Sequence, residues 1–80
     1  MKFSVTITVT LKEGLLDPEG QAIQNAIKGL GFPAEELRTA RLFRLQLEAP
    51  DAGAARDMAT KISERLLANP VIHRYEIEVA

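Results

Sequence analysis

The chain has 80 residues, of which 46% are hydrophobic, with no cysteine, one histidine and a formal net charge of −1 at pH 7. This composition excludes disulfide bonds, thiolate metal sites and sites built from several histidines, and no apolar run approaches the roughly 20 residues that cross a bilayer. Because acidic and basic residues are interspersed rather than gathered in a basic stripe, a nucleic-acid groove is disfavoured, and the sequence predicts one small cytoplasmic domain over residues 1–80.

Residues 3–11 alternate strictly between apolar and polar side chains and are rich in β-branched residues, which predicts a strand. The apolar side of this strand consists of Phe3, Val5, Ile7, Val9 and Leu11. That side is expected to face a core, while the serine and threonine side faces water or another polar surface. Since the alternation begins directly after the first residues, no signal peptide is expected.

The stretch 11–20 joins this strand to a helix and organises the chain. Gly14 permits a backbone angle that most residues resist, Asp17 can accept hydrogen bonds from the free N–H groups of the next turn, and Pro18 lies where its missing N–H costs nothing. A phosphate-binding loop also joins a strand to a helix, but it needs several glycines and a Lys or Ser at the helix start. Because an aspartate occupies the place of the anion here, a capped turn is the favoured interpretation.

Apolar residues recur every three or four positions between Pro18 and Leu30, which predicts an amphipathic helix. The apolar stripe of this helix consists of Ala22, Ile23, Ala26, Ile27 and Leu30. Gly31 is the expected left-handed stop, and Phe32-Pro33 prevents continuation. We expect the stripe to pack against the first strand, so Ile27→Asp is expected to unfold the monomer.

Residues 38–48 are predicted to be extended, after a short turn at residues 34–37. The inward side is Phe43, Leu45 and Leu47, and the outward side is Arg44, Gln46 and Glu48. One strand and a hairpin are both compatible with this length. No Gly, Asn, Asp or Pro lies between Arg38 and Leu42, so one long strand, bent or bulged near Ala40, is favoured.

A second helix is predicted from about Ala52 to Ala68, capped by Asp51 and stopped by Asn69-Pro70. Its apolar stripe is Ala55, Met58, Ala59, Ile62 and Leu66, with Met58 interpreted as core filler. Residues 71–79 form the last strand. One side of it carries Val71, His73, Tyr75, Ile77 and Val79, and the other carries Ile72, Arg74, Glu76 and Glu78.

The lengths of these elements predict self-association. A strand of about ten residues spans about 33 Å, whereas the first helix covers only about 20 Å. The strands therefore overhang the helices, and a long regular strand is a pairing hazard at a sheet edge. A dimer or larger homo-oligomer resolves both problems.

Few residues are candidates for catalysis, because a nucleophile or acid–base group needs an orienting partner. His73 alternates with apolar residues on a strand, so we interpret it as a packed or surface residue. Glu76 and Glu78 lie about 7 Å apart on one strand face. We interpret them as a solvated face that pairs with Arg44 or Arg74 rather than as a paired-carboxylate site. No catalytic, metal-binding or cofactor-binding residue is expected.

Two segments carry a resemblance to a known family. The first runs from Val9 to Gly20 and continues through Ala22-Ile23 and Leu30-Gly31-Phe32; the second runs from Leu66 to Ile72 and continues through residues 75–79. They resemble the N-terminal and C-terminal signatures of PurS, the small subunit of bacterial and archaeal phosphoribosylformylglycinamidine (FGAM) synthase. Both signatures occur in order over nearly the whole chain, which makes the resemblance specific.

The middle of the chain departs from the family pattern. Where the family tends to have Val-Arg-x-Gly-Lys, this chain has Leu37-Arg38-Thr39-Ala40-Arg41, so the glycine is absent. The resemblance implies an α+β fold, namely a two-layer α/β sandwich in the order β-α-β(-β)-α-β. This is a ferredoxin-like variant with two helices on one face of a sheet that extends across a dimer.

The resemblance also implies a function. PurS is a subunit of an ATP-dependent C–N ligase that converts FGAR to FGAM with glutamine-derived ammonia in de novo purine biosynthesis. PurL holds the ATP and substrate site, PurQ is the glutaminase, and PurS joins them and assists ammonia transfer. The implied partners are PurL, PurQ and further copies in a homodimer or tetramer, with no nucleic acid and no membrane. ATP and Mg are used by the complex, and this subunit binds no cofactor.

Two sets of residues are therefore singled out. The expected turn and cap residues are Gly14, Asp17, Pro18, Gly31, Asn69 and Pro70, and the candidate partner contacts are Lys12, Arg38, Arg41, Arg44 and His73. The alternative function is a small ligand-sensing dimer that binds an amino acid or nucleotide between its subunits. An independent hydrolase is disfavoured by the missing acid–base cluster.

Overall fold

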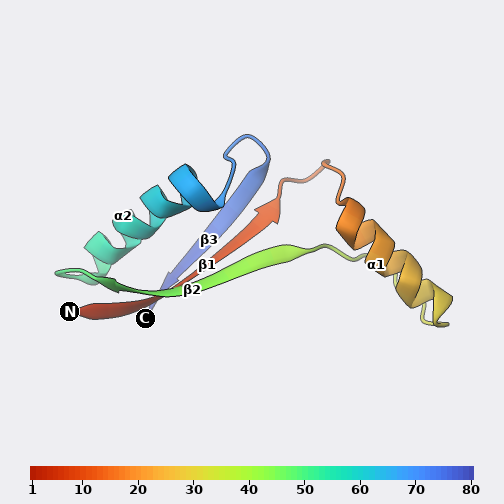
Figure 1. The fold of residues 1–80 in the computed structure, drawn as a ribbon, viewed down its shortest axis with the longest axis horizontal. Coiled ribbons are helices and arrows are strands. Elements are labelled where there is room, and N and C mark those ends of the chain that lie inside the picture. Colours follow the sequence, from red (N-terminus) through yellow and green to blue (C-terminus); the bar gives the residue numbers. More distant parts are fainter.

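The computed structural model describes residues 1–80 as one antiparallel sheet, two α-helices and a short π-helical segment (Figure 1). In chain order the elements are β1 (Lys2–Leu11), α1 (Pro18–Gly29), β2 (Ala40–Glu48), α2 (Ala52–Ile62), η1 (Ser63–Leu67, the π-helical segment) and β3 (His73–Val79). The predicted α+β, ferredoxin-like class and the predicted strands and helices are confirmed. Residues 32–39 form no strand of their own, so the middle of the chain contributes one strand and no hairpin.

The strands lie in the order β2-β1-β3, and both outer strands run antiparallel to β1. Ile7 lies opposite Phe43 on β2 and Ile77 on β3, and the other inward residues follow this register. Val5, Ile7 and Val9 are at most 4% exposed, whereas the threonines on the other face stay partly exposed. The predicted alternation of β1 is confirmed, and its central position explains why its inward side is so well buried.

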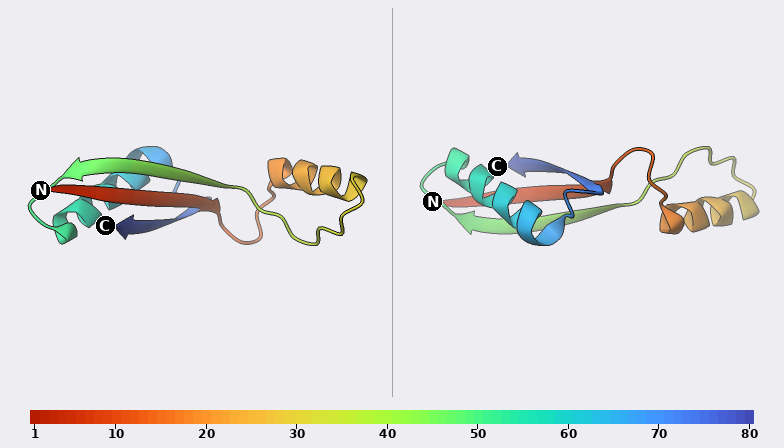
Figure 2. Two further views of the ribbon diagram at one scale, coloured as in Figure 1. Left: turned by 90° about the horizontal axis from the view of Figure 1, so that it is seen from below. Right: turned by 90° about the horizontal axis from the view of Figure 1, so that it is seen from above.

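Helix α2 covers one face of the sheet and packs against β1 and β3 (Figures 1 and 2). Ala55 and Ala59 are fully buried, since their small side chains let the helix lie close to the strands. Ser63 is fully buried as well, and its Oγ donates a hydrogen bond to the Ala59 carbonyl at 2.8 Å. Only 9 of the 80 residues are buried, so this core is small even for a chain of this length.

The segment η1 changes which leucine faces the core. The Ala68 N–H donates to the Ser63 carbonyl at 2.8 Å, which fits one more residue into the turn than an α-helix holds. Leu67 therefore packs against the core while Leu66 is 80% exposed. The prediction that Leu66 continues the stripe is wrong, because it assumed 3.6 residues per turn throughout. Met58 also lies outside the core, since it is 39% exposed.

Helix α1 does not lie on the sheet. It extends beyond the ends of β1 and β2, so the molecule is 51 Å long but only 24 by 15 Å in its other dimensions (Figures 1 and 2). Ile23 and Leu30 are 40% and 75% exposed. The prediction that residues 18–30 pack against the first strand is therefore wrong for the single chain, which removes the basis for expecting that Ile27→Asp unfolds the monomer. Of the two helices expected on one sheet face, this face carries α2 alone.

The outer edge of β3 is partly closed by α2. Ser4 and Ala80 exchange two backbone hydrogen bonds of 3.0 and 2.8 Å, so the alternation of antiparallel pairs directs the Ile77 carbonyl outward. Arg56 of α2 donates from Nη1 to that carbonyl at 3.0 Å. No side-chain hydrogen bond reaches the outer edge of β2, which stays open for pairing.

Candidate docking surface

Asp17 ties the start of α1 to the start of β2. Its carboxylate accepts from the Gly20 N–H at 3.0 Å, which caps the helix, and from the Thr39 N–H at 2.8 Å. The Thr39 hydroxyl donates to the same carboxylate at 2.9 Å. The Thr39 N–H and then the Gly20 N–H hold the pKa of Asp17 below its ordinary value of 3.8, with a smaller contribution from Arg38. The cap follows from the sequence, but nothing local to Asp17 indicates Thr39, which lies 22 residues away.

The other expected turn residues lie at chain reversals. Gly14 and Gly31 have φ of +82° and +96°, the left-handed region in which glycine is favoured. Pro18 lies in the first turn of α1. The Asn69 side chain accepts from the Val71 N–H at 3.0 Å and shapes the turn that holds Pro70. With the Asp17 carboxylate bonded to the helix start, the strand-to-helix turn offers no place for a phosphate.

Two glycines of α1 are expected to respond oppositely to alanine. A Cβ at Gly20 would lie 2.7 Å from Asp17 Oδ2 and 3.1 Å from the Leu37 carbonyl, so Gly20→Ala displaces the carboxylate and lowers the melting temperature. A Cβ at Gly29 would meet nothing within 4 Å. Gly29→Ala is therefore expected to stabilise α1 by about 0.5–1 kcal/mol, because alanine loses less backbone entropy. Thermal unfolding by circular dichroism measures both, and an equal response of the two variants would contradict this geometry.

The projecting helix presents an unpartnered apolar face, which we call the α1 face and define as Ile23, Ile27 and Leu30. Its neighbours at the two ends of the helix are also exposed, with Leu16 at 86% and Phe32 at 63%. Isolated exposed apolar residues are ordinary on a protein surface, but contiguous ones indicate an interaction site. The α1 face is therefore a candidate docking surface.

An open groove of about 550 Å³ lies on the helix-covered side of the sheet, between η1 and the start of α1. We call it the sheet-end groove, and its lining residues include Val9, Leu11, Arg41, Leu67 and His73. Arg41 belongs there because it lies opposite Val9 in the ladder. The His73 Nδ1 accepts from the Asn69 N–H at 2.9 Å, so in the neutral ring the proton is on Nε2.

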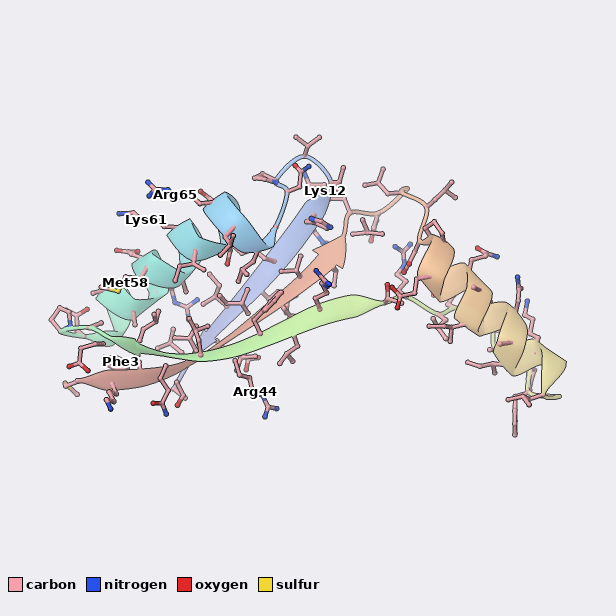
Figure 3. All side chains as sticks on the ribbon, in the orientation of Figure 1. Phe3, Lys12, Arg44, Met58, Lys61 and Arg65 are labelled. Carbon is pink, nitrogen blue, oxygen red and sulfur yellow. The ribbon has the colours of Figure 1, made fainter.

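The candidate partner contacts are divided between surfaces. Arg41 and His73 line the sheet-end groove, whereas Arg44 lies opposite Thr6 and points away from the side that carries α2 (Figure 3). Lys12 lies at the end of β1, where its N–H donates to the Ile72 carbonyl at 2.9 Å, and Arg38 is exposed before β2. The structure therefore brings two of the five residues to one site.

The open face of the sheet is polar and carries no ion pair between strands. Thr6 of β1 lies between Arg44 and Glu78 in one cross-strand row, so these two charges are not direct neighbours. The predicted pairing of Glu76 and Glu78 with arginines is therefore wrong. The one ion pair joins the amino group of Met1 to Glu48 at 3.0 Å, and both side chains are exposed.

No three or more His, Asp or Glu residues come together where they could hold a metal ion, and none of the helices has the length and apolar character to span a membrane. The buried Ser63 hydroxyl is bonded to a backbone carbonyl rather than to a base. The Tyr75 hydroxyl donates to Glu64 at 2.8 Å, a bond that raises the pKa of Tyr75. The surface presents the apolar α1 face and the unpaired backbone groups at the edge of β2, and both are suited to docking.

Residues 4–80 match a family model described as PurS, phosphoribosylformylglycinamidine (FGAM) synthase. The PurS subunit of phosphoribosylformylglycinamidine synthase from Methanocaldococcus jannaschii is 37% identical over 78 residues, which cover 96% of this chain and 94% of that protein. The crystal structure of PurS from the same organism has a TM-score of 0.88 at 35% identity, covering 98% and 95% of the two chains. A chain in the structure of PurLQS from Thermotoga maritima has a TM-score of 0.91 at 30% identity, covering 100% and 99%.

Proposed function

The chain belongs to the PurS family and is a subunit of FGAM synthase, and from this premise we propose that it acts by docking PurL to PurQ while carrying no reaction of its own. Its role in purine biosynthesis is then to help glutamine-derived ammonia reach the synthetase subunit during the ATP-dependent conversion of FGAR to FGAM. The observation that supports this most directly is the similarity, over the whole chain, to a chain of the PurLQS structure.

The composition of the surface supports a docking role. The α1 face, the open edge of β2 and the sheet-end groove are accessible in one chain, and no group of three or more His, Asp or Glu residues that could hold a metal ion accompanies them. A subunit that presents apolar surface without reactive groups contributes through position rather than chemistry. We propose accordingly that ATP and Mg are bound elsewhere in the complex and that this cytoplasmic subunit binds no cofactor.

The five candidate contacts remain proposals for the surface that meets PurL or PurQ. Arg41 and His73 share the sheet-end groove, so they are suited to one partner. Arg44 lies on the opposite face of the sheet and suits another contact. Lys12 and Arg38 lie near the turn between these two surfaces.

Reconstitution tests this function. The purified chain is mixed with PurL and PurQ, and the three are expected to co-elute in size-exclusion chromatography when substrate nucleotides are present. Glutamine-dependent FGAM formation is expected to fall to background when this chain is omitted, and the chain alone is expected to turn over neither FGAR nor glutamine. Turnover by the chain alone, or full glutamine-dependent activity without it, contradicts the docking role. A thermal shift with an amino acid or nucleotide, together with no co-elution, favours a ligand-sensing dimer instead.

A further inference from the structure

Two arginines that are distant in the sequence line one hollow at the end of the sheet. The hollow has a volume of about 160 Å³, and its lining residues are Thr10, Leu11, Glu13, Arg38, Thr39 and Arg74. Arg74 of β3 lies opposite Thr10 of β1, on the face of the sheet that α2 leaves uncovered. Arg38 reaches the hollow from the segment before β2. Neither arginine lines the sheet-end groove, so this is a second and cationic feature of the surface.

Neither guanidinium has a partner within the chain. Arg56 is the arginine that forms a side-chain hydrogen bond, and the one ion pair joins Met1 to Glu48. Glu13 is the one carboxylate that lines the hollow, and it forms no ion pair with either arginine. An anion that entered the hollow would therefore be attracted by two positive charges that are not already neutralised.

The backbone holds both arginines at fixed positions. Arg38 directly precedes Thr39, whose N–H and hydroxyl donate to Asp17 at 2.8 and 2.9 Å. Arg74 is the second residue of β3 and lies within the ladder to β1. Because the backbone is already ordered, an anion that binds here needs to order only the two side chains. The planar guanidinium group is also the side chain best matched to a carboxylate or phosphate group.

The size of the hollow favours one side chain over a whole small molecule. Sites for cofactors and other small molecules measure about 300–1,000 Å³, whereas this hollow measures about 160 Å³. The head group of an aspartate or glutamate is small enough to enter it. A second copy of this chain is a poor source of that head group, because a two-fold contact centred here would place Arg38 and Arg74 against the same two arginines.

We propose that Arg38 and Arg74 form a clamp for one aspartate or glutamate side chain on the surface of PurL or PurQ. The Thr10 hydroxyl lies in the same hollow and is a further donor to that carboxylate. This inference rests on the docking function proposed above and adds the chemistry that the partner presents. Arginines that lose water at an interface are among the residues that contribute most to binding.

A titration of the chain into fixed amounts of PurL and PurQ tests the clamp, with glutamine-dependent FGAM formation as the signal. Arg38→Gln and Arg74→Gln are each expected to raise the half-maximal concentration of the chain about ten-fold or more. The rate at saturating chain is expected to match that of the wild type, because the clamp acts on assembly. Arg65→Gln is the matched control, since it removes an exposed arginine on the α2 side of the sheet (Figure 3) and is expected to change the half-maximal concentration less than about two-fold.

The double variant tests whether the two arginines bind the same group. If both contact one carboxylate, their losses are coupled, and the combined loss is expected to be smaller than the product of the two single losses. Losses that multiply would mean two independent contacts and would overturn the clamp. Both arginines are exposed, so the variants are expected to keep the melting temperature and the association state of the wild type. A change in either property that accompanies the weaker assembly also overturns the clamp.

The outcomes for the clamp and for the docking function are distinguishable. If the wild-type chain supports glutamine-dependent synthesis and both single variants titrate like it, the clamp is wrong and the docking function stands. If the wild-type chain has no effect on synthesis, the docking function is wrong and the clamp with it. A thermal shift of the isolated chain with inorganic phosphate that Arg38→Gln abolishes would assign the hollow to a phosphate compound and overturn the clamp.

Discussion

Ile7→Ala is expected to remove a large share of the chain's stability. Ile7 lies at the middle of the central strand, fully buried between Phe43 and Ile77 and in one hydrophobic cluster with Ala59. Truncating a buried isoleucine to alanine costs about 2–5 kcal/mol, because burial is lost and a cavity forms. A chain of this length has a net stability of only about 4–12 kcal/mol. Urea unfolding followed by circular dichroism, at one fixed chain concentration, is expected to show a much lower midpoint.

Thr8→Ala provides the matched control for Ile7→Ala. Thr8 is the next residue of β1, but its side chain lies on the open face and is partly exposed. Its truncation is expected to change the free energy of unfolding by less than about 1 kcal/mol. Equal losses in the two variants would mean that the side of the sheet facing α2 is not the core. The chain concentration is held constant because any association between copies would stabilise the folded chain.

Asp17→Ala is expected to destabilise the chain more than Asp51→Ala, although both residues are helix caps. Asp51 accepts one capping bond, from the Ala54 N–H at 2.7 Å. Asp17 accepts from Gly20 and in addition from the N–H and hydroxyl of Thr39, so its loss also frees the start of β2 from the start of α1. Amide hydrogen exchange is expected to show faster exchange across α1 and at Thr39 in Asp17→Ala. In Asp51→Ala the increase is expected to stay within the first turn of α2.

The same carboxylate predicts how the difference between wild type and Asp17→Ala depends on pH. Because hydrogen bonds from Thr39 and Gly20 lower the pKa of Asp17 in the folded chain, its contribution to stability is present above its unfolded value of 3.8. That contribution is lost as the pH falls through the lower folded-state pKa. The gap in melting temperature between the two proteins is therefore expected to be constant near neutral pH and to shrink in acid. A difference in melting temperature that grew on acidification would show that the ionised form of Asp17 is not the form that stabilises the fold.

The local patterns predicted most elements and misplaced one of them. Period-two alternation placed β1 and its buried side correctly, since a strand buried on one face leaves this pattern in sequence. The start of α1 can also be predicted from the sequence, because Asp17 and Pro18 act within one turn of the helix. The position of α1 relative to the sheet could not be predicted in this way. An apolar stripe indicates that one face of a helix is suited to burial, but it does not indicate which surface covers that face.

Two further features of the site could not be predicted, for physical reasons. The hydrogen bonds between Asp17 and Thr39 join segments 22 residues apart in the sequence. Propensity scales describe single residues and their near neighbours, so they cannot predict a contact at this separation. The π-helical turn at Ser63–Leu67 departs from the 3.6 residues per turn that the apolar pattern assumes, and it exchanges the roles of Leu66 and Leu67. At Ala40, where the family glycine is absent, the strand simply begins, and no non-glycine residue in the chain has a positive φ.

The hydrogen bond from Arg56 to the Ile77 carbonyl makes the two borders of the sheet unequal. A sheet with two equivalent free borders can add molecule after molecule and grow into a fibre. Here the Arg56 side chain occupies the outer edge of β3, and an incoming strand would first have to displace it. Pairing between the sheets of two identical molecules is thus limited to the free edge of β2. Two molecules that pair there edge to edge leave no second free edge for a third molecule.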